Sequence, residues 1–489
     1  MGEPQYLSYP KLSLAQTVFN LASPFSDPQS KQNALTTLQN AIRDDKMAPL
    51  YAYLAHPITG KLNASGEGSA NTSPVVSRQN TLAGGDPMQP LRRTSSINTP
   101  SIVGVLGGQA DMSVGLPWDE SFYEELRQEN EKELAAIQKE EDEAVEKAGE
   151  TEVQSAKGKR AGLYARIGDK EKALEEFEKL LEKTSILGTK IDIVLAIIRI
   201  GLFFDDKLLV RKTVDRASVL VESGGDWDRR NRLKAYQGLH LLTIRAHGLA
   251  APLLLDSVST FTSTELCSYS NLVVYATLAG TVALPRRDFK TRVVDSPEIR
   301  AVFGSDTDDT DMTDAPPAGG AVNLTTLAAG TASAEAQAHA EPQVDFRPLA
   351  TMMHSLYAGN YAAFFTALAA IETAFLSHDR YLFAHRAWFV REMRLRAYAQ
   401  LLQSYKVVGL RSMADSFGVG VDWLDRDLAP FIAGKRLACS IDRVRGVIET
   451  QRADDKNRQY ADVVSKGDQL ITKLQKYGQV VRLRGSERS

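Results

Sequence analysis

Paired stretches of helical apolar periodicity, separated by short turns, constrain the fold of this sequence more than any other feature. The clearest pair spans residues 156–187, where two amphipathic helices flank a turn at Gly168-Asp169. Comparable turns recur at residues 204–206, near Gly248, near residues 285–287 and at Gly359-Asn360. Because one such pair cannot bury its apolar face alone, neighbouring pairs must stack on one another.

The stacking predicts a mostly α protein built around a tetratricopeptide-like helical-repeat solenoid, which we place at residues 151–404. A chain of 489 residues also exceeds the usual size of a single hydrophobic core, so more than one domain is expected. Between residues 304 and 343 an Asp/Thr-rich run and an Ala/Gly/Thr-rich run interrupt the pattern. We interpret this segment as a disordered insertion.

A different pattern follows the solenoid, and we predict a winged helix at residues 405–450. One amphipathic helix is expected over residues 391–410, a second is expected to stop at Gly418, and a third is expected to begin with Asp422 as its N-cap. Two strand-like runs then alternate apolar and polar residues, at 436–441 and 444–448, around a turn at Asp442-Arg443. The order of helices followed by a hairpin is that of a winged helix.

The same region carries a specific family resemblance. Residues 413–421 (MADSFGVGV), 431–437 (FIAGKRL) and 441–444 (IDRV) resemble the C-terminal half of a PCI domain. Upstream, residues 224–239 (GGDWDRRNRLKAYQGL) and 256–266 (DSVSTFTSTEL) resemble one PCI family, that of the seventh non-ATPase subunits of the 26S proteasome lid. The likeness extends from about residue 162 to residue 477, and residues 44–51 (DDKMAPLY) give its best N-terminal match.

The resemblance implies a non-catalytic scaffold that supports lid assembly, docking and ATP-dependent degradation of ubiquitylated proteins. It also implies three sets of partners: the other PCI subunits of the lid, the lid's deubiquitinase pair, and the ATPase ring of the regulatory particle. The alternatives are a PCI scaffold subunit of the COP9 signalosome and a nucleic-acid-binding PCI protein. The run at residues 224–239 favours the lid over the signalosome.

Three segments precede the solenoid. Residues 1–59 carry two or three amphipathic helical patterns, and residues 60–115 are rich in Gly, Ser, Thr, Asn and Pro, so we interpret them as a disordered linker. In this linker, residues 92–95 (RRTS) resemble a basophilic kinase site at Ser95, although chance also explains such a match in a Ser-rich tract. Residues 116–150 predict an exposed acidic helix whose few apolar residues contact a partner face.

The last segment, residues 451–489, predicts a long helix with an apolar stripe and a short tail. The stripe fits insertion into a helical bundle, and the resemblance implies that the subunits of the lid gather their terminal helices in this way. The other interpretation is that the helix folds back onto its own winged helix. The residues expected to bind partners here are Leu470, Leu474, Tyr477 and Val481.

The hairpin of the winged helix is the second candidate partner surface. An exposed strand edge offers unpaired main-chain groups, so a neighbouring hairpin can add to it, which is how the resemblance implies that PCI subunits line up. We assign partner binding on the hairpin to Leu437, Cys439, Ile441 and Val447.

No residue pattern predicts chemistry, and we expect no catalytic site, no cofactor and no metal. The seven histidines include no pair with the spacing that a metal-dependent deubiquitinase needs; the closest pairs are His240/His247 and His378/His385, which we interpret as partly buried core histidines. Phosphate-binding loops and nucleophile elbows are absent from the sequence. Cys267 and Cys439 lie in apolar segments and indicate a reducing compartment.

Charge and hydropathy limit the partners and the location. The formal charge of −3 gives no case for nucleic acid, and the helix expected before the hairpin carries three aspartates against one arginine, which would repel a phosphate backbone. No signal sequence or stretch of about 18 apolar residues is present, so we expect no membrane partner and a location in the cytoplasm and nucleus.

The run Asp226 to Leu233 has two interpretations. In the structural one, Asp226 caps a helix, Asp228 lies in its first turn, Trp227 packs onto the previous repeat and the arginines pair with acidic groups across the groove. In the functional one, the arginines bind an acidic segment of a partner. The sequence favours the structural interpretation.

Overall fold

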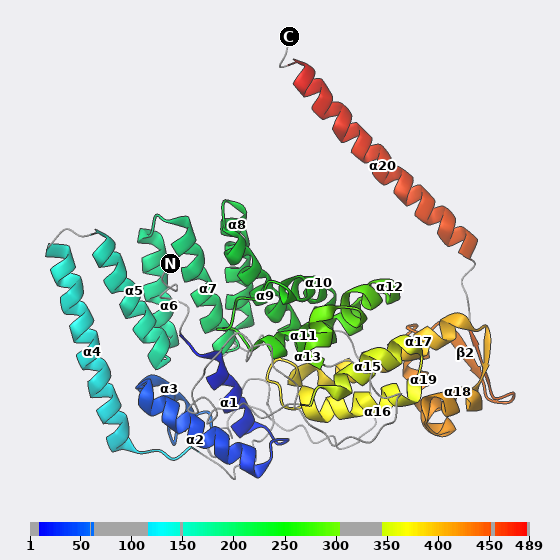
Figure 1. Cartoon of the computed structure of the whole chain (residues 1–489), viewed down its shortest axis with the longest axis horizontal. Coiled ribbons are helices and arrows are strands. Elements are labelled where there is room, and N and C mark those ends of the chain that lie inside the picture. The colour runs from blue at the N-terminus through cyan, green and yellow to red at the C-terminus, as the bar shows by residue number, and fades with distance from the viewer. Residues whose placement is uncertain are drawn as a thin grey trace, which may run out of the picture. The chain divides into compact units, whose positions relative to one another are not determined.

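The protein is described here by a computed structural model, which covers residues 9–58, 60–62, 116–146, 150–303, 345–450 and 455–486. Residues 63–115 of the expected linker, including Ser95, and the whole of the expected insertion at residues 304–343 lie outside the described residues. The chain forms two compact units, one of residues 1–357 and 367–390 and the other of residues 358–366 and 391–489. Figure 1 labels their helices and strands.

The first unit begins with three short helices, in agreement with the amphipathic patterns there. They are α1 (Leu12–Ala22), α2 (Pro28–Asp44) and α3 (Ala48–Ala55). The apolar stripe of α1, with Leu14, Val18 and Leu21, is buried because this helix packs on α2 and on α7 of the solenoid. The N-terminal helices are therefore part of the core of the first unit.

The acidic helix α4 (Glu120–Glu146) packs between α3 and α5 and buries Leu126. Its Glu133 accepts hydrogen bonds from Lys46, at 2.9 Å, and from Arg166. Partial burial opposes ionisation of this carboxyl, but the two cations still hold the pKa of Glu133 below its usual value. Contacts from two neighbouring elements thus fix a helix whose outer face remains charged.

The solenoid consists of successive antiparallel helices, which Figure 1 shows side by side from cyan to green. This confirms the helical-repeat fold expected from the paired patterns. The helices are α5 (Glu150–Ile167), α6 (Lys170–Lys183), α7 (Leu187–Phe203), α8 (Lys207–Glu222), α9 (Trp227–Thr243), α10 (His247–Val258) and α11 (Tyr269–Ala283).

Four of the five turns contain a residue in the left-handed conformation. Gly168 and Gly359 have φ of 81° and 88°, while Asp205 and Arg245 adopt φ of 56° and 64° despite having side chains. The turn that we expected near Gly248 lies at residues 244–246, because Gly248 is already inside α10. The other four turns fall where the sequence places them.

Helix α7 is the most deeply buried element of the solenoid. Every residue from Ile191 to Phe203 is buried, including Asp192 and Arg199. Its C-terminal carbonyls are capped from a distant segment, since the buried Arg380 guanidinium donates to the carbonyl oxygens of Leu202 and Phe203, each at 2.9 Å.

No helix among the described residues is long and apolar enough to cross a membrane.

The rest of the first unit continues the helical path. It comprises α12 (Arg286–Phe289), a π-helical turn (Lys290–Val294), α13 (Pro297–Phe303) and α15 (Arg347–Ala358), then a second π-helical turn (Glu372–Leu376) and a 3₁₀ turn (Phe383–His385). Helices α16 (Tyr361–Ile371) and α17 (Arg386–Ser404) each contribute residues to both units.

The second unit contains the expected winged helix. Helices α18 (Leu410–Phe417) and α19 (Val421–Ala433) precede a sheet of order β1-β3-β2, formed by β1 (Val407–Gly409), β2 (Cys439–Asp442) and β3 (Val447–Thr450). Gly418 ends α18 in the left-handed conformation, with φ of 66°. The long helix α20 (Asp455–Ser486) follows.

Three local predictions for the winged helix were wrong. The N-cap of α19 is Gly420, and Asp422 lies inside the first turn. The hairpin strands are shorter than expected, since the turn takes up residues 443–446. A third strand, β1, occupies residues that we assigned to a helix, because β3 pairs with Val407–Gly409.

Stacked aromatic rings form the core of this unit. Phe417 stacks on Tyr361 with 4.7 Å between ring centroids and lies 5.0 Å from the rings of both Tyr398 and Phe365. Gly418 brings α18 close to α16, because a Cβ there would meet the Ala362 side chain at 3.4 Å. The sequence signal at Gly418 therefore marks both a helix end and a close approach.

The buried His247 predicts an acid-sensitive step in unfolding of the first unit. Its ring stacks on Trp388, and neither ring nitrogen has a hydrogen-bond partner among the described residues. Burial, followed by the charges of His385 and Arg245, lowers the pKa of His247 to about 4. As the pH falls, His247 therefore takes up its proton in the unfolded chain at a higher pH than in the folded chain. The free energy of unfolding falls by about 3 kcal/mol between pH ~6.5 and pH 4.

We expect His247→Phe to keep the stacking and to remove this loss. Urea unfolding midpoints of the full-length chain at pH 7 and pH 4.5 would measure it, with His354→Phe, at a half-buried histidine, as the control. An identical fall in midpoint for His247→Phe and the unmodified chain would contradict the assignment.

Candidate assembly surfaces

The sheet of the winged helix has an edge at β2, and its ladder shows which main-chain groups that edge presents. The Thr450 N–H donates to the Lys406 carbonyl oxygen at 2.9 Å, and the Leu410 N–H donates to the Gly446 carbonyl oxygen at 2.7 Å. In an antiparallel ladder the bonded pairs alternate. Gly446, just before β3, and the even-numbered residues of β3, Ile448 and Thr450, therefore form their main-chain hydrogen bonds on the side of β1.

The odd-numbered residues of β3 must then bond toward β2, where Val447 faces Asp442 and Glu449 faces Ser440. It follows that the main-chain groups of Cys439 and Ile441 point away from β3. This outer side of β2 is the free edge of the sheet, and we call it the β2 edge.

The hairpin residues that we predicted to bind partners occupy different environments. Leu437 and Cys439 are buried and Ile441 is half-buried, so their side chains help to form the core of the winged helix. Val447 is half-buried on the opposite face of the sheet, opposite Gly409 and Asp442. Only the main chain of Cys439 and Ile441 is placed for strand addition.

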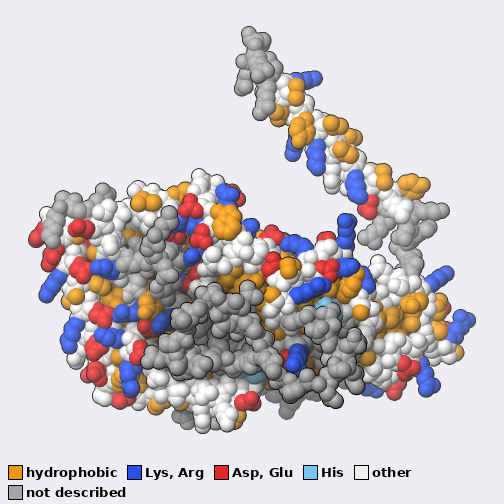
Figure 2. All heavy atoms as spheres, in the orientation of Figure 1, with side chains coloured by type: hydrophobic (Ala, Val, Ile, Leu, Met, Phe, Trp, Pro, Cys, Tyr) orange, Lys and Arg blue, Asp and Glu red, His pale blue; other side chains and the backbone are white. Residues whose placement is uncertain are grey.

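Helix α20 carries the second candidate surface. Its large apolar side chains between Tyr460 and Val481 are 48% to 70% exposed. Figure 2 shows these apolar side chains along the helix. They include all four residues that we predicted to bind partners: Leu470, Leu474, Tyr477 and Val481.

The apolar residues of α20 follow a heptad repeat. One line of positions, seven residues apart, holds Tyr460, Gly467, Leu474 and Val481, and a second holds Val463, Leu470 and Tyr477. A third line beside them holds Val464, Ile471 and Gly478. Alternating spacings of three and four residues define the seam of a coiled coil, which pairs with another helix. We call these three lines the α20 seam.

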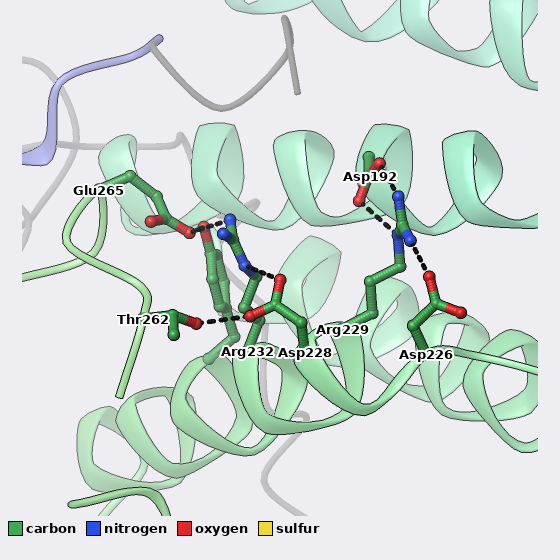
Figure 3. Close-up of polar contacts among 8 residues, drawn as sticks. Asp192, Asp226, Asp228, Arg229, Arg232, Thr262 and Glu265 are labelled. Atoms are coloured by element: carbon green, nitrogen blue, oxygen red, sulfur yellow. Dashed lines mark hydrogen bonds and ion pairs between the residues drawn. The ribbon is translucent and has the colours of Figure 1, made fainter. Parts of the chain in front are cut away.

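The start of α9 is fixed by a network of charged side chains, shown in Figure 3. Arg229 donates two parallel hydrogen bonds to the Asp192 carboxylate of α7, at 2.9 and 2.7 Å, and a third to Asp226. Gly188 permits this approach, because a Cβ there would lie 3.1 Å from the Arg229 guanidinium carbon. The bidentate pair locks α9 onto α7.

A second arginine extends the network to the loop that follows α10. Arg232 donates to Asp228 at 2.8 Å and approaches Glu265 at 3.6 Å, while Thr262 donates to the other Asp228 oxygen at 2.8 Å. Glu265 also accepts from the buried Tyr236 hydroxyl at 3.0 Å. Arg229 and Arg232 therefore act within the fold, as the structural interpretation of this run predicted.

Two details of that interpretation were wrong. Trp227 is 65% exposed and does not pack onto the previous repeat. Asp226 occupies the N-cap position of α9, but its carboxylate pairs with Arg229 instead of accepting a capping hydrogen bond. The sequence could not show this because a cap and an ion pair need the same residue type there.

Two acidic residues of α19 also serve the fold. Asp425 accepts from Arg443 of the hairpin turn at 2.7 Å, and Asp427 pairs with Arg394 and accepts from the Tyr398 hydroxyl at 2.8 Å. These contacts join α19 to the hairpin and to α17. They give two of the three aspartates of this helix, Asp425 and Asp427, a role in the fold.

Over the ranges that the structure describes, no group of three or more His, Cys, Asp or Glu side chains is arranged to hold a metal ion. Both cysteines are free, and burial raises the pKa of Cys267 and of Cys439. A raised pKa disfavours the thiolate that a nucleophilic cysteine requires.

Three family models match the chain. The model of the 26S proteasome subunit RPN7 matches residues 119–292, the PCI domain matches residues 370–452, and the RPN7/PSMD6 C-terminal helix of the 26S proteasome regulatory subunit matches residues 459–481. Whole-chain relatives agree. The chain is 37% identical over 477 residues to the 26S proteasome regulatory subunit rpn7 of Schizosaccharomyces pombe, covering 97% of each protein.

The chain belongs to the RPN7 family of 26S proteasome regulatory subunits. It is also 40% identical over 375 residues to the RPN7 subunit of Saccharomyces cerevisiae, covering 76% of this chain and 79% of that protein. With non-ATPase regulatory subunit 6 of Caenorhabditis elegans it shares 32% identity over 473 residues, or 97% and 93% of the two chains. These matches support the proteasome and not the signalosome alternative.

The matched ranges coincide with the two surfaces. The PCI match contains the β2 edge, and the third match contains the whole α20 seam. Sequence reasoning missed strand β1, whose signal was the β-branched pair Val407-Val408 before Gly409. It also missed the heptad order of α20, which the spacing of its apolar residues contains.

The Arg229–Asp192 pair should couple α9 to α7 energetically. In a double-mutant cycle with Arg229→Ala and Asp192→Ala, we expect a coupling free energy of about 1–2 kcal/mol, because the pair is bidentate and largely screened from water. Thermal or urea unfolding of the full-length chain measures it.

The matched control is the cycle for Arg443 and Asp425, whose arginine side chain is 75% exposed. We expect a coupling below ~0.5 kcal/mol there. Equal couplings in the two cycles would contradict the role given to the Arg229 pair.

Proposed function

We propose that this chain is a non-catalytic scaffold subunit of the proteasome lid, required for lid assembly and for docking in ATP-dependent degradation of ubiquitylated proteins. The observation that carries the proposal is the combination of RPN7-family membership with two surfaces suited to main-chain and helix pairing, the β2 edge and the α20 seam. The proposal requires no catalytic chemistry from the solenoid.

Strand addition at the β2 edge is the first proposed contact. Main-chain groups of Cys439 and Ile441 point outward, while their side chains are drawn into the winged helix. A neighbouring PCI subunit can therefore pair with the backbone without disturbing that core. This contact explains why buried side chains occur at a partner-binding strand.

Helix pairing along the α20 seam is the second proposed contact. Burying each large apolar side chain of the seam contributes roughly 1.5–3 kcal/mol. Among the described residues of α20 none of these side chains is buried, so the contribution remains available to a partner. We propose that Leu470, Leu474, Tyr477 and Val481 enter a bundle with terminal helices of other lid subunits.

The proposed partners are the other PCI subunits of the lid, its deubiquitinase pair and the ATPase ring, and the proposed location is the cytoplasm and nucleus. The two free cysteines fit the reducing conditions of those compartments. The domain boundaries inferred from the sequence are also kept as proposals, with the winged helix at residues 405–450.

Ile441→Pro tests the β2 edge. Proline removes the outward-pointing N–H but no bond to β3, so the chain should fold, while binding to the neighbouring subunit should weaken about tenfold. Ile441→Ala is the matched control, because it also truncates the side chain but keeps the N–H. Incorporation of tagged variants into the purified lid is the readout, and equal incorporation of the two variants would refute strand addition.

Leu470→Asp with Leu474→Asp tests the seam. Two charges there should abolish entry into the lid without unfolding the chain, because both side chains are exposed. Ser465→Asp with Gln479→Asp places the same charges on the opposite face and should assemble normally. Normal assembly of the seam variant, or of a chain ending after Thr450, would show that α20 does not join a bundle.

A further inference from the structure

Two glycines lie within the α20 seam. Gly467 belongs to the line of Tyr460, Leu474 and Val481, and Gly478 belongs to the line of Val464 and Ile471. Both have helical backbone conformations, and a Cβ built on either would meet nothing within 4 Å. Neither a turn nor a close contact inside the described chain accounts for a glycine at these positions.

These glycines weaken the free helix. Glycine inside a solvent-exposed helix costs about 1 kcal/mol relative to alanine, so the pair costs ~2 kcal/mol. They leave two notches in an otherwise bulky seam, three helical turns apart, while the residues around them are Val, Leu, Ile and Tyr. In a coiled coil, each position of the seam receives or supplies a side chain. A notch on one helix therefore accommodates a larger side chain from the other.

Charge gives the second property of the partner. Lys466 and Lys473 form the line that flanks the seam on the side opposite Val464 and Ile471. The only acidic residues between positions 459 and 482 are Asp462 and Asp468, and the heptad places both outside the seam and its flanks. Flanking charges set the choice of partner in coiled coils.

From these two features we infer that α20 pairs with an acidic helix of another subunit, one that inserts large apolar side chains into the notches at Gly467 and Gly478 and places carboxylates beside Lys466 and Lys473. The inference rests on the proposed bundle and specifies the chemistry of its partner. A second copy of this chain does not fit, because its own seam has notches at the same positions and no flanking carboxylate.

A glycine that accommodates a partner side chain differs measurably from one without such a role, because replacing it with alanine changes helix stability and assembly in opposite directions. Gly467→Ala with Gly478→Ala should strengthen the free helix and yet weaken assembly. Methyl groups in a packed interface typically cost 1–3 kcal/mol, so we expect incorporation to fall about tenfold or more in competition with the unmodified chain. Hydrogen exchange of the amides between residues 459 and 482 in the free full-length chain should slow in the same variant.

Ser465→Ala with Gln479→Ala is the matched control, because both residues lie on the face away from the seam. It should assemble like the unmodified chain. Lys466→Glu with Lys473→Glu should also lower incorporation about tenfold, and Lys476→Glu, which lies off the flank, should not. Cross-linking through a photoreactive residue at Val463, in the purified complex, should label an acidic helical segment of another subunit.

Full incorporation of the glycine variant, while Leu470→Asp with Leu474→Asp still blocks assembly, would overturn the notch and leave the bundle intact. Normal assembly of both would refute the bundle itself. A cross-link to a second copy of the chain, to a basic segment, to RNA or to lipid would overturn the acidic helical partner.

Discussion

Burial of α7 is the constraint on which the structure of the first unit depends. A helix that is apolar on every side can be stable in water only when neighbours cover all of it, and α1, α6, α8 and α9 pack against it. Of its two buried charged residues, Asp192 and Arg199, Asp192 pairs with Arg229 of α9 within this packing. The distant Arg380 caps its end. The N-terminal helices, the repeats and the segment around Arg380 thus become one cooperative core.

Surface groups that have no contact within the fold are the candidates for binding a partner. Arg229 and Arg232 of α9, and Asp425 and Asp427 of α19, contact neighbouring elements, so these side chains already have a role in the fold. Main-chain groups at the β2 edge and apolar side chains of the α20 seam remain without such a role among the described residues. The two proposed contacts differ in kind: strand addition uses the backbone and tolerates many sequences, whereas helix pairing depends on side chains and can select a partner.

The sequence predicted the fold class, most of the turns and the PCI-like order of helices and hairpin, because apolar periodicity and glycine at positive φ are local signals. Gly168, Gly359 and Gly418 each mark a real helix boundary. The sequence-based predictions were wrong where contacts between residues far apart in the chain determine the local structure. Strand β1 exists because β3 lies beside it, and Trp227 is exposed although its large apolar ring suggested burial. The candidate residues of α20 are exposed, and their binding to a partner stays a prediction. Leu437 and Cys439 are buried, because the sequence does not show which groups of β2 face outward.

The central claim is that the chain works as a structural subunit of the proteasome lid. Affinity purification of the tagged full-length protein from its own cells tests it most directly, with mass spectrometry and a ubiquitin-dependent degradation assay on the eluate. We predict recovery of lid and ATPase subunits together with ATP-dependent degradation of a ubiquitylated substrate. Recovery of signalosome subunits, of RNA, or of the chain without a stable partner would contradict the account.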